Sequence, residues 1–196
     1  MKNKLILIFS LILLSFATTA SADKTVLAGG CFWCMESDFE KLDGVTDVVS
    51  GFTGGTLKNP TYNGNHAGHY EAVEITYNPD QVSYQQLLDH YWVNIDPFDD
   101  RGQFCDKGPS YLSAIFVANA AEEKIAEESK ALVVEMFPKQ KVITPIIEAS
   151  TFYPIAGNES YHQDYAKNNP FRYKAYRWNC GRDDRLKEIW GDRATH

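Results

Sequence analysis

The sequence predicts an α+β domain, with a mixed β-sheet core, flanking helices and a long irregular carboxyl-terminal region. The length of 196 residues favours one domain, because single cores commonly close at about 100–200 residues. Hydrophobic residues make up 44% of the chain and charged residues 23%, which is ordinary globular composition. Segments with strand and helix periodicity follow one another in irregular order, which favours an α+β arrangement over a doubly wound sheet.

The first segment, residues 1–22, is typical of a secretory signal peptide. Lys2 and Lys4 give a positive start, an apolar run covers residues 5–17, and an Ala-x-Ala site ends at Ala22. The apolar run is shorter than the roughly 20 residues that span a bilayer, which disfavours the alternative, an uncleaved membrane anchor. We therefore expect export, cleavage after Ala22, and a periplasmic or secreted mature domain over 23–196 without stable membrane insertion.

The first half of the mature chain is predicted as a strand, a helix and two more strands. A short buried strand over 25–28 runs into two glycines, and Gly44 ends the helix that follows. Strands are expected over 45–52 and 71–77, with a polar loop between them. The helix is recognised by apolar residues at helical spacing, Met35, Phe39 and Leu42.

In the second half of the chain, predicted strands and helices alternate less regularly, and the composition becomes aromatic and polar after Thr151. The long helix within it carries one apolar stripe that we expect to be buried, formed by Ala121, Ile125, Leu132, Val133 and Met136. The expected elements are a helix capped by Ser83, a loop over 95–109, a strand over 111–118, the long helix from Asn119 to Pro138, a strand over 143–149, and helices at about 159–167 and 184–190.

The charge balance argues against a nucleic-acid partner. The chain has 19 Lys and Arg against 26 Asp and Glu, a net charge of -7. Loss of Lys2 and Lys4 with the signal peptide leaves 17 basic against 26 acidic residues, a net charge of -9. Phosphate binding needs clustered basic residues, so an acidic chain of this kind is a poor candidate.

The most specific local feature is the segment Gly29-Gly30-Cys31-Phe32-Trp33-Cys34. A cysteine there opens a helix, so unpaired N–H groups and the positive end of the helix dipole lie beside it. These groups favour the thiolate, which is the nucleophilic form of cysteine. Cys34 follows one helical turn later, within reach of Cys31. Cys31 is therefore predicted to attack and Cys34 to resolve.

Two alternatives without catalysis exist for this cysteine pair. Export favours a structural disulfide, but a CxxC bridge closes almost no loop and adds little stability. Half of a zinc site is disfavoured, because no second CxxC or CxxH pair completes four ligands. His66 and His69 form a loop pair without a carboxylate, which is more typical of a structural role than of a metal site. We therefore expect redox chemistry without a metal.

An ordered series of motifs covers most of the mature chain. The series is GCFW at 30–33, SGFTGG at 50–55, NPTY at 59–62, GHYEAV at 68–73, DKGPSYLSAI at 106–115 and YHQDY at 161–165. It is similar, in order and spacing, to the motifs of the peptide-methionine (S)-S-oxide reductase family, MsrA. Tyr70 and Leu112 replace a small residue and an arginine that are usual there. The resemblance implies the two-layer α/β sandwich of that family.

The resemblance also implies an activity, the thiol-dependent reduction of methionine (S)-sulfoxide, free or in proteins, to methionine. Cys31 would attack the sulfoxide sulfur and become a sulfenic acid. Glu71 would supply a proton to the oxygen, and Tyr62 and Tyr111 would donate hydrogen bonds to it. A carboxyl group beside aromatic rings is desolvated, which raises its pKa and keeps that proton available.

The remaining roles follow from the same resemblance. Phe32 and Trp33 would hold the substrate methyl group, and Asp106 would position the site through hydrogen bonds. An intramolecular disulfide would form next, and an external dithiol reductant, thioredoxin-like, would reduce it. No metal, nucleotide or flavin cofactor is implied. The expected biological role is repair of oxidised exported proteins by a monomeric enzyme.

Two cysteines are candidates for resolving the sulfenic acid. Cys34 is favoured, because the helical turn places it beside Cys31 without any movement of the chain end. Cys180 is the alternative, because the family often recycles through cysteines near the carboxyl end, and it is also a candidate relay. Cys105 precedes Asp106 and is either close to the site or a passive buried thiol.

Two other functions compete with sulfoxide reduction. A thioredoxin-like dithiol oxidoreductase or thiol chaperone rests only on the Cys31–Cys34 spacing, and a disulfide-stapled binding domain is the alternative without catalysis. The oxidoreductase predicts disulfide reduction that survives loss of Glu71 and both tyrosines. Sulfoxide reduction instead requires those side chains.

Overall fold

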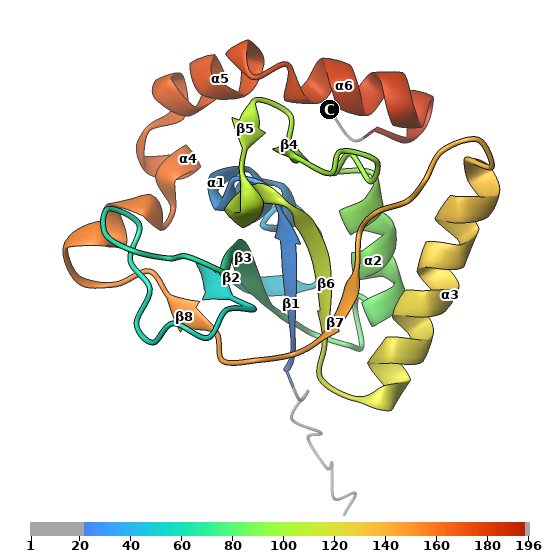
Figure 1. Cartoon of the computed structure of the whole chain (residues 1–196), viewed down its shortest axis with the longest axis horizontal. Coiled ribbons are helices and arrows are strands. Elements are labelled where there is room, and N and C mark those ends of the chain that lie inside the picture. The colour runs from blue at the N-terminus through green and yellow to red at the C-terminus, as the bar shows by residue number, and fades with distance from the viewer. Residues whose placement is uncertain (1–21, 195–196) are drawn as a thin grey trace, which may run out of the picture.

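A six-stranded sheet organises the part of the chain that the computed structural model describes, residues 22–194 (Figure 1). The predicted signal peptide lies outside these residues except for Ala22. The strands are β1 (Asp23–Gly29), β2 (Val45–Thr53), β3 (Tyr70–Tyr77), β6 (Ser113–Val117), β7 (Ile146–Glu148) and β8 (Tyr153–Pro154). Their order is β7-β6-β1-β3-β2-β8, with β6 and β7 parallel and the other neighbours antiparallel. This mixed sheet confirms the predicted fold class.

The strand register brings the end of β1 to the beginnings of β3 and β6. Both neighbours run antiparallel to β1, and Gly29 at its end lies opposite Ser113 at the start of β6. Antiparallel neighbours place the end of one strand beside the start of the next. Cys31, Glu71 and Tyr111 therefore meet at one end of the sheet, although they are far apart in sequence.

Helices cover one face of the sheet and the end where these residues meet. They are α1 (Phe32–Phe39), α2 (Tyr84–Trp92), α3 (Ala120–Met136), α4 (Tyr165–Asn168), α5 (Pro170–Asn179) and α6 (Arg182–Trp190). Short 3-10 helices are η1 (Pro109–Tyr111), η2 (Gly157–His162) and η3 (Gly191–Arg193), and β4 (Gly102–Gln103) pairs with β5 (Asp106–Lys107) in a small hairpin. The helix α2 begins with a capping box in which Ser83 and Gln86 bond each other's backbone, as the predicted cap requires.

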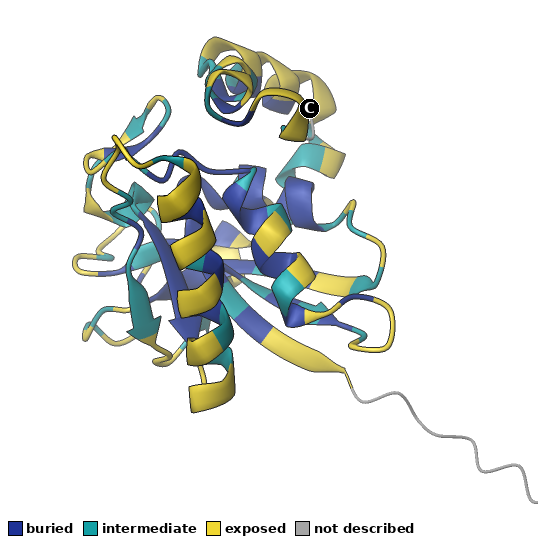
Figure 2. Ribbon diagram, turned by 90° about the vertical axis from the view of Figure 1, so that its right-hand side faces the viewer, coloured by how far each residue is buried: buried dark blue, intermediate teal, exposed yellow. Residues whose placement is uncertain are grey.

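The main core lies between the sheet and helices α1, α2, α3 and α6. Leu27, Val73 and Ile115 from the strands meet Phe39 and Leu88 from the helices in this core. The opposite face of the sheet carries a small cluster around three alanines and Phe116. Burial follows this layering, since dark blue runs along the strands and yellow along the outer faces of the helices (Figure 2).

The helix α3 begins and ends as predicted, and Ile125 and Val133 of the predicted stripe pack against the core. Its buried residues are Ala126, Ser129 and Val133, whereas Leu132 is 55% exposed and Met136 also lies at the surface. Ser129 is buried because its hydroxyl accepts the indole N–H of Trp92 at 2.8 Å. The prediction was wrong for Ala121, Leu132 and Met136, because it counted apolar residues alone and here the polar Ser129 occupies the inner face.

The chain after Thr151 is more helical than predicted. The predicted helix at 159–167 is divided into η2 and α4, and α5 and β8 were not anticipated. Asp164 separates the first two, with φ of 55° in the left-handed region. The final helix, α6, agrees with the predicted segment at 184–190. Within residues 22–194, no helix combines the length and apolar character needed to cross a membrane.

Buried charges fasten the last two helices to α1. The Arg177 guanidinium of α5 donates to both carboxylate oxygens of Asp38 at 2.9 Å. Arg182, at the start of α6, donates to the carbonyl of Asn94 at 2.7 Å and is almost fully buried. These contacts hold α5 and α6 across the end of the sheet, above β4 and β5 in Figure 1.

Candidate active site

Cys31 occupies the N-cap position of α1, directly after β1. The turn into the helix depends on Gly30, which has φ of +86°. The position that a side chain would take at Gly30 is occupied by Gln103. A Cβ at Gly30 would lie 2.5 Å from the Gln103 Cβ, so only glycine fits. Gln103 is itself fixed, because its amide bonds the backbone of Asp96 in both directions at 2.7 and 2.8 Å.

Glu71 lies against the first turn of α1, one residue after the start of β3. Its Oε2 accepts the backbone N–H of Phe32 at 3.1 Å, and the side chain is 1% exposed. Its Oε1 has no hydrogen-bond partner in the described structure. Burial raises the pKa of Glu71 to about 8, and the nearby Asp106 adds to the shift. The carboxyl group therefore holds its proton at neutral pH, as the predicted acid requires.

Tyr62 and Tyr111 stand near Glu71 with half-buried side chains. Burial and the adjacent Glu71 raise the pKa of Tyr62 to about 12, and the same two causes raise the pKa of Tyr111 further. Both hydroxyls are therefore neutral donors. Tyr62 lies in the β2–β3 loop, and its backbone N–H donates to Glu159 Oε2 at 2.8 Å. Glu159 thus joins this loop to the carboxyl-terminal region.

Aromatic rings surround the first turn of α1. The Phe32 ring is fully buried and lies 6.0 Å from that of Tyr62 and 5.5 Å from that of His162, centroid to centroid. Trp33 is half-buried and stacks on Tyr165, with centroids 3.8 Å apart and planes 6° apart. The Trp33 indole N–H donates to His162 Nδ1 at 3.0 Å. The arrangement forms an apolar wall beside Cys31 suited to a small thioether methyl group.

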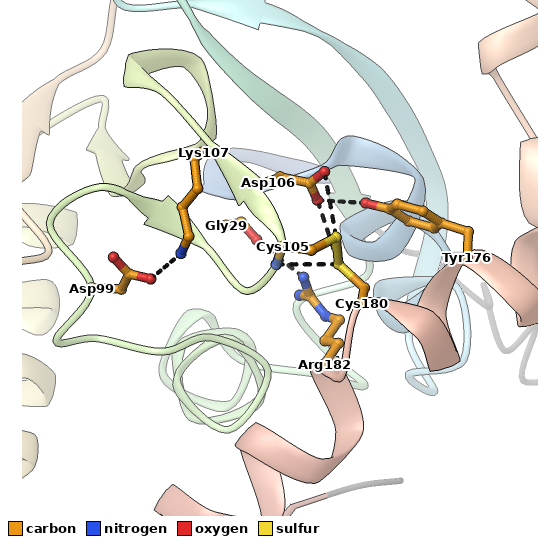
Figure 3. Close-up of a disulfide and its surroundings, with 8 residues drawn as sticks. All are labelled: Gly29, Asp99, Cys105, Asp106, Lys107, Tyr176, Cys180 and Arg182. Atoms are coloured by element: carbon orange, nitrogen blue, oxygen red, sulfur yellow. Dashed lines mark hydrogen bonds and ion pairs between the residues drawn. A yellow bond between two sulfur atoms is a disulfide. The ribbon is translucent and has the colours of Figure 1, made fainter.

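Asp106 reaches Cys31 through a tyrosine. The Tyr176 hydroxyl donates to Asp106 Oδ2 at 2.5 Å (Figure 3), and a hydrogen bond between Tyr176 and Cys31 favours the thiolate of Cys31. Burial raises the pKa of Asp106, although the bond from Tyr176 opposes the shift. This position of Asp106 is compatible with the expected positioning role. Tyr176 connects Asp106 to Cys31, and the sequence did not indicate this residue.

Cys31 and Cys34 are both free thiols, 6% and 2% exposed, and their side chains hydrogen-bond to each other. Their charge distribution differs from the prediction. Burial, the neighbouring Cys34 and Glu71 raise the pKa of Cys31 well above its ordinary value. The Cys31 side chain accepts no capping hydrogen bond from the backbone of the first turn.

Cys34 is the more acidic member of the pair. The hydrogen bond from Cys31 lowers its pKa to about 7, and the guanidinium groups of Arg182 and Arg177 act in the same direction against the effect of burial. Burial and the shared hydrogen bond therefore favour the neutral thiol at Cys31, whereas the two arginines favour the thiolate at Cys34. The sequence motif located both sulfurs but not the arginines behind them, which come from α5 and α6.

Cys105 and Cys180 form a disulfide that joins the β4–β5 hairpin to the end of α5 (Figure 3). Cys105 is exposed, so its interpretation as a passive buried thiol is wrong. Cys180 is not a free thiol in this state. The bridge lies next to the Asp106 carboxylate, and the Cys105 backbone N–H also points at Cys180 Sγ, 3.3 Å away.

Three aromatic side chains of the site were not among the predicted site residues. They are His162, Tyr165 and Tyr176. The YHQDY motif was noticed, but nothing in its spacing relates it to Trp33, more than 125 residues earlier. Outside this site, His69 is buried and bonded to the carbonyl of Leu57 at 2.8 Å, in agreement with a structural role.

Comparison with protein families gives a match over nearly the whole described chain. The family model "Peptide methionine sulfoxide reductase" matches residues 23–194. The chain is 48% identical over 198 aligned residues to peptide methionine sulfoxide reductase MsrA 2 of Caulobacter vibrioides, covering 96% of this chain and 99% of that protein. It is 49% identical to MsrA of Bacillus licheniformis over 168 residues, covering 84% and 91% of the two chains.

Solved structures with the same fold lead to the same family. Methionine sulfoxide reductase A of Corynebacterium diphtheriae superposes with a TM-score of 0.67 at 30% identity, over 79% of this chain and 77% of that one. Reduced Mxr1 of Saccharomyces cerevisiae superposes with a TM-score of 0.68 at 26% identity, over 79% and 89% of the two chains.

Proposed function

The chain belongs to the peptide methionine sulfoxide reductase family, MsrA, and from this premise we propose how its own residues carry out and recycle the reaction. As a peptide-methionine (S)-S-oxide reductase, it is an oxidoreductase that converts the sulfoxide to the thioether. The observation that carries the proposal is the protonated, buried Glu71 held against the first turn of the Cys31 helix.

The reductive step begins at Cys31. Its proton moves along the existing hydrogen bond to Cys34, and the Cys31 sulfur bonds to the sulfoxide sulfur. The sulfoxide oxygen takes the proton of Glu71 while the hydroxyls of Tyr62 and Tyr111 donate to it. The substrate S–O bond and the new S–S bond then break as the protonated oxygen moves to the Cys31 sulfur, so Cys31 becomes a sulfenic acid and methionine leaves as the thioether.

Recycling requires a second thiol and an external reductant. Cys34 is the resolving thiol of this proposal, because it already contacts Cys31 and has a lowered pKa. Its attack on the sulfenic sulfur releases water and forms the Cys31–Cys34 disulfide. A thioredoxin-like protein dithiol then supplies two electrons and two protons, and is itself oxidised to a disulfide. Cys180 is less suited to the resolving step, because it is engaged with Cys105.

The cellular role that we propose is repair of oxidised exported proteins. Its support is the basic start, apolar run and Ala-x-Ala site of residues 1–22, which are typical of a secretory signal peptide. The mature domain would then act in the periplasm or outside the cell. Fractionation of a full-length tagged chain, with amino-terminal sequencing of the product, tests this role, and an uncleaved cytoplasmic product would contradict it.

The chemical proposal is tested with a peptide carrying methionine (S)-sulfoxide and a dithiol reductant. We expect turnover in the wild type, none in Cys31→Ser, and a rate lowered by about 10²- to 10⁴-fold in Glu71→Gln. Reduction of an unrelated disulfide serves as the control reaction. If Glu71→Gln kept the full rate of sulfoxide reduction, Glu71 would not be the acid.

The resolving thiol is tested in a single turnover without reductant. We expect one methionine per enzyme and a Cys31–Cys34 disulfide located by peptide mapping. Cys34→Ser should still release one methionine but should retain the sulfenic acid, detectable with dimedone. A first product joining Cys31 to Cys180 would assign the resolving role to Cys180 instead.

A further inference from the structure

A second buried glutamate, Glu36, lies on α1 one turn beyond the cysteine pair. It is 2% exposed and takes no part in the reaction described above. Its Oε2 accepts the Ser50 hydroxyl at 2.8 Å. Its Oε1 accepts the Gln163 side-chain N–H at 2.6 Å and the Asp164 backbone N–H at 2.5 Å. Burial is unfavourable for a carboxylate, and these three donors are what offset it here.

Gln163 extends this contact to the sheet. Its Nε2 also donates to the Val48 carbonyl at 2.8 Å, and its Oε1 accepts the Ser50 N–H at 2.9 Å. The amide group therefore bonds the edge of β2 on one side and Glu36 on the other. Glu36 and Gln163 together tie the segment 162–165 to α1 and β2.

The segment 162–165 carries two of the rings that define the apolar wall. His162 accepts the Trp33 indole N–H at 3.0 Å and lies 4.0 Å from the Tyr62 ring, centroid to centroid. Tyr165 stacks on the Trp33 ring, with centroids 3.8 Å apart. Asp164, between them, has a left-handed backbone with φ of 55°, which costs a non-glycine residue free energy. Its N–H bond to Glu36 holds that conformation.

We propose that Glu36 is a positioning residue for the methionine side chain of the substrate. It acts through Gln163 and Asp164, which set His162 and Tyr165 against Trp33 and so fix the shape of the wall that receives the substrate methyl group. This inference rests on the proposed function. Glu36 touches neither the sulfoxide nor the reacting sulfur, so it sets how tightly substrate binds and leaves the rate at saturation unaffected.

The test measures single-turnover methionine release against the concentration of N-acetyl-methionine (S)-sulfoxide amide. Glu36→Gln removes the charge and leaves a single accepting oxygen at nearly constant volume, so the contacts to Ser50, Gln163 and Asp164 are weakened together. We expect the half-saturating concentration to rise about 10-fold, the effect of losing about 1.4 kcal/mol of binding, with the maximal rate changed less than about 3-fold. A higher concentration of reductant should not bring the half-saturating concentration of the variant back to the wild-type value, because no reductant takes part in this step.

Glu40→Gln is the matched control, on the same helix one turn later. Glu40 pairs with Lys167 at 2.5 Å near the surface, and no hydrogen bond joins it to Gln163 among the described residues. Lys167 also bonds the Asp164 side chain at 2.9 Å, a contact that Glu40→Gln leaves in place. We expect both kinetic constants to stay near wild type. Gln163→Leu is the second variant, since it removes the link while leaving Glu36 bonded to Ser50 and Asp164, and it should raise the half-saturating concentration in the same sense.

The outcomes separate this inference from the proposed function. A wild-type enzyme that releases no methionine would reject the function, whereas an active wild type with unchanged saturation in folded Glu36→Gln would reject only the positioning role. A lower maximal rate with unchanged saturation would also reject it. If Glu36→Gln does not fold by circular dichroism, Gln163→Leu decides, with raised half-saturation supporting the role and unchanged half-saturation overturning it.

Discussion

Glu71 illustrates how a single side chain obtains its chemistry from its surroundings. The same residue in solution would be ionised at neutral pH. Here the end of β1, the first turn of α1 and the tyrosines remove it from water, and the bonds from the Phe32 N–H and the Tyr111 hydroxyl oppose the rise in its pKa only in part. Desolvation therefore converts an ordinary carboxylate into a proton donor at neutral pH.

The first prediction at this scale concerns the pH dependence of the reductive step. The proton of Glu71 is present below a pKa of about 8 and lost above it. The ratio of maximal rate to half-saturating concentration, which reports the free enzyme, should therefore fall as pH rises through about 8. Stopped-flow single turnovers between pH 6 and 10 measure it. A descending limb that persists unchanged in Glu71→Gln would assign it to another group.

The second prediction concerns stability and the same carboxyl group. The pKa of Glu71 is raised from about 4.3 in the unfolded chain to about 8 in the folded protein. The folded state then binds the extra proton between these values. Its contribution to stability is therefore complete below the unfolded pKa and is lost as pH rises towards the folded pKa.

Glu71→Gln removes this titration. Between about pH 5 and 7.5 the free energy of unfolding of the variant should fall less steeply than that of the wild type, by up to about 1.4 kcal/mol per pH unit. Urea titrations at several pH values measure both slopes. Glu36 titrates in the wild type and the variant alike, so it cancels in the comparison. Parallel curves for the two proteins would show that Glu71 is ionised in the folded state.

At the scale of elements, the β4–β5 hairpin and α5 are joined by the Cys105–Cys180 disulfide. The two cysteines are 75 residues apart in sequence, and the hairpin carries Asp106 while α5 carries Tyr176. A bridge over so long a loop restricts the unfolded chain and also keeps the Asp106–Tyr176 hydrogen bond together in the folded one. It thus supports the surroundings of Cys31.

The prediction for this bridge is a loss of stability without a loss of chemistry. Cys105→Ser with Cys180→Ser should lower the free energy of unfolding by about 2–4 kcal/mol, the range typical of such disulfides. The doubly substituted protein should still release one methionine in a single turnover. Denaturant unfolding with and without a reducing agent measures the effect. Equal stability of the wild type in both conditions would argue against a stabilising bridge.

At the scale of the whole molecule, the carboxyl-terminal helices complete a site that begins at the amino-terminal strand. The ion pair between Asp38 and Arg177 joins α1 to α5, and Arg182 joins α6 to the carbonyl of Asn94. These charges also lie behind Cys34 and lower its pKa. The same contacts therefore serve folding and the polarisation of the cysteine pair.

Removal of one partner should be costly because the other charges stay buried. Asp38→Asn should lower the free energy of unfolding by about 3–5 kcal/mol. The control is Glu128→Gln in the exposed Lys124–Glu128 pair, whose side chains are 76% and 63% exposed, and it should change stability by less than about 1 kcal/mol. Chemical denaturation compares them. Similar small losses in both variants would mean that the Asp38 contacts are not energetically important.

Much of the fold was predictable because local patterns and buried elements agree. Alternation and apolar runs located β1, β2 and β3, and the capping residues Ser83 and Asn119 located two helices. Prediction was poorest after Thr151, where short turns and α5 bury few apolar residues of their own. Such segments are held by side-chain contacts to distant elements, for which single-sequence periodicity has no signal.

The sequence by itself located the Gly30-Cys31 turn and the cysteine one turn later, and its motifs indicated the family. Only the tertiary structure decided in which direction the pKa of each thiol shifts. Local sequence indicated a Cys31 thiolate at a helix start, but burial places the proton on Cys31 and the two arginines favour charge on Cys34. The reason is physical: a pKa depends on solvent access and on charges within a few ångströms, and in a folded chain both are set by residues remote in sequence.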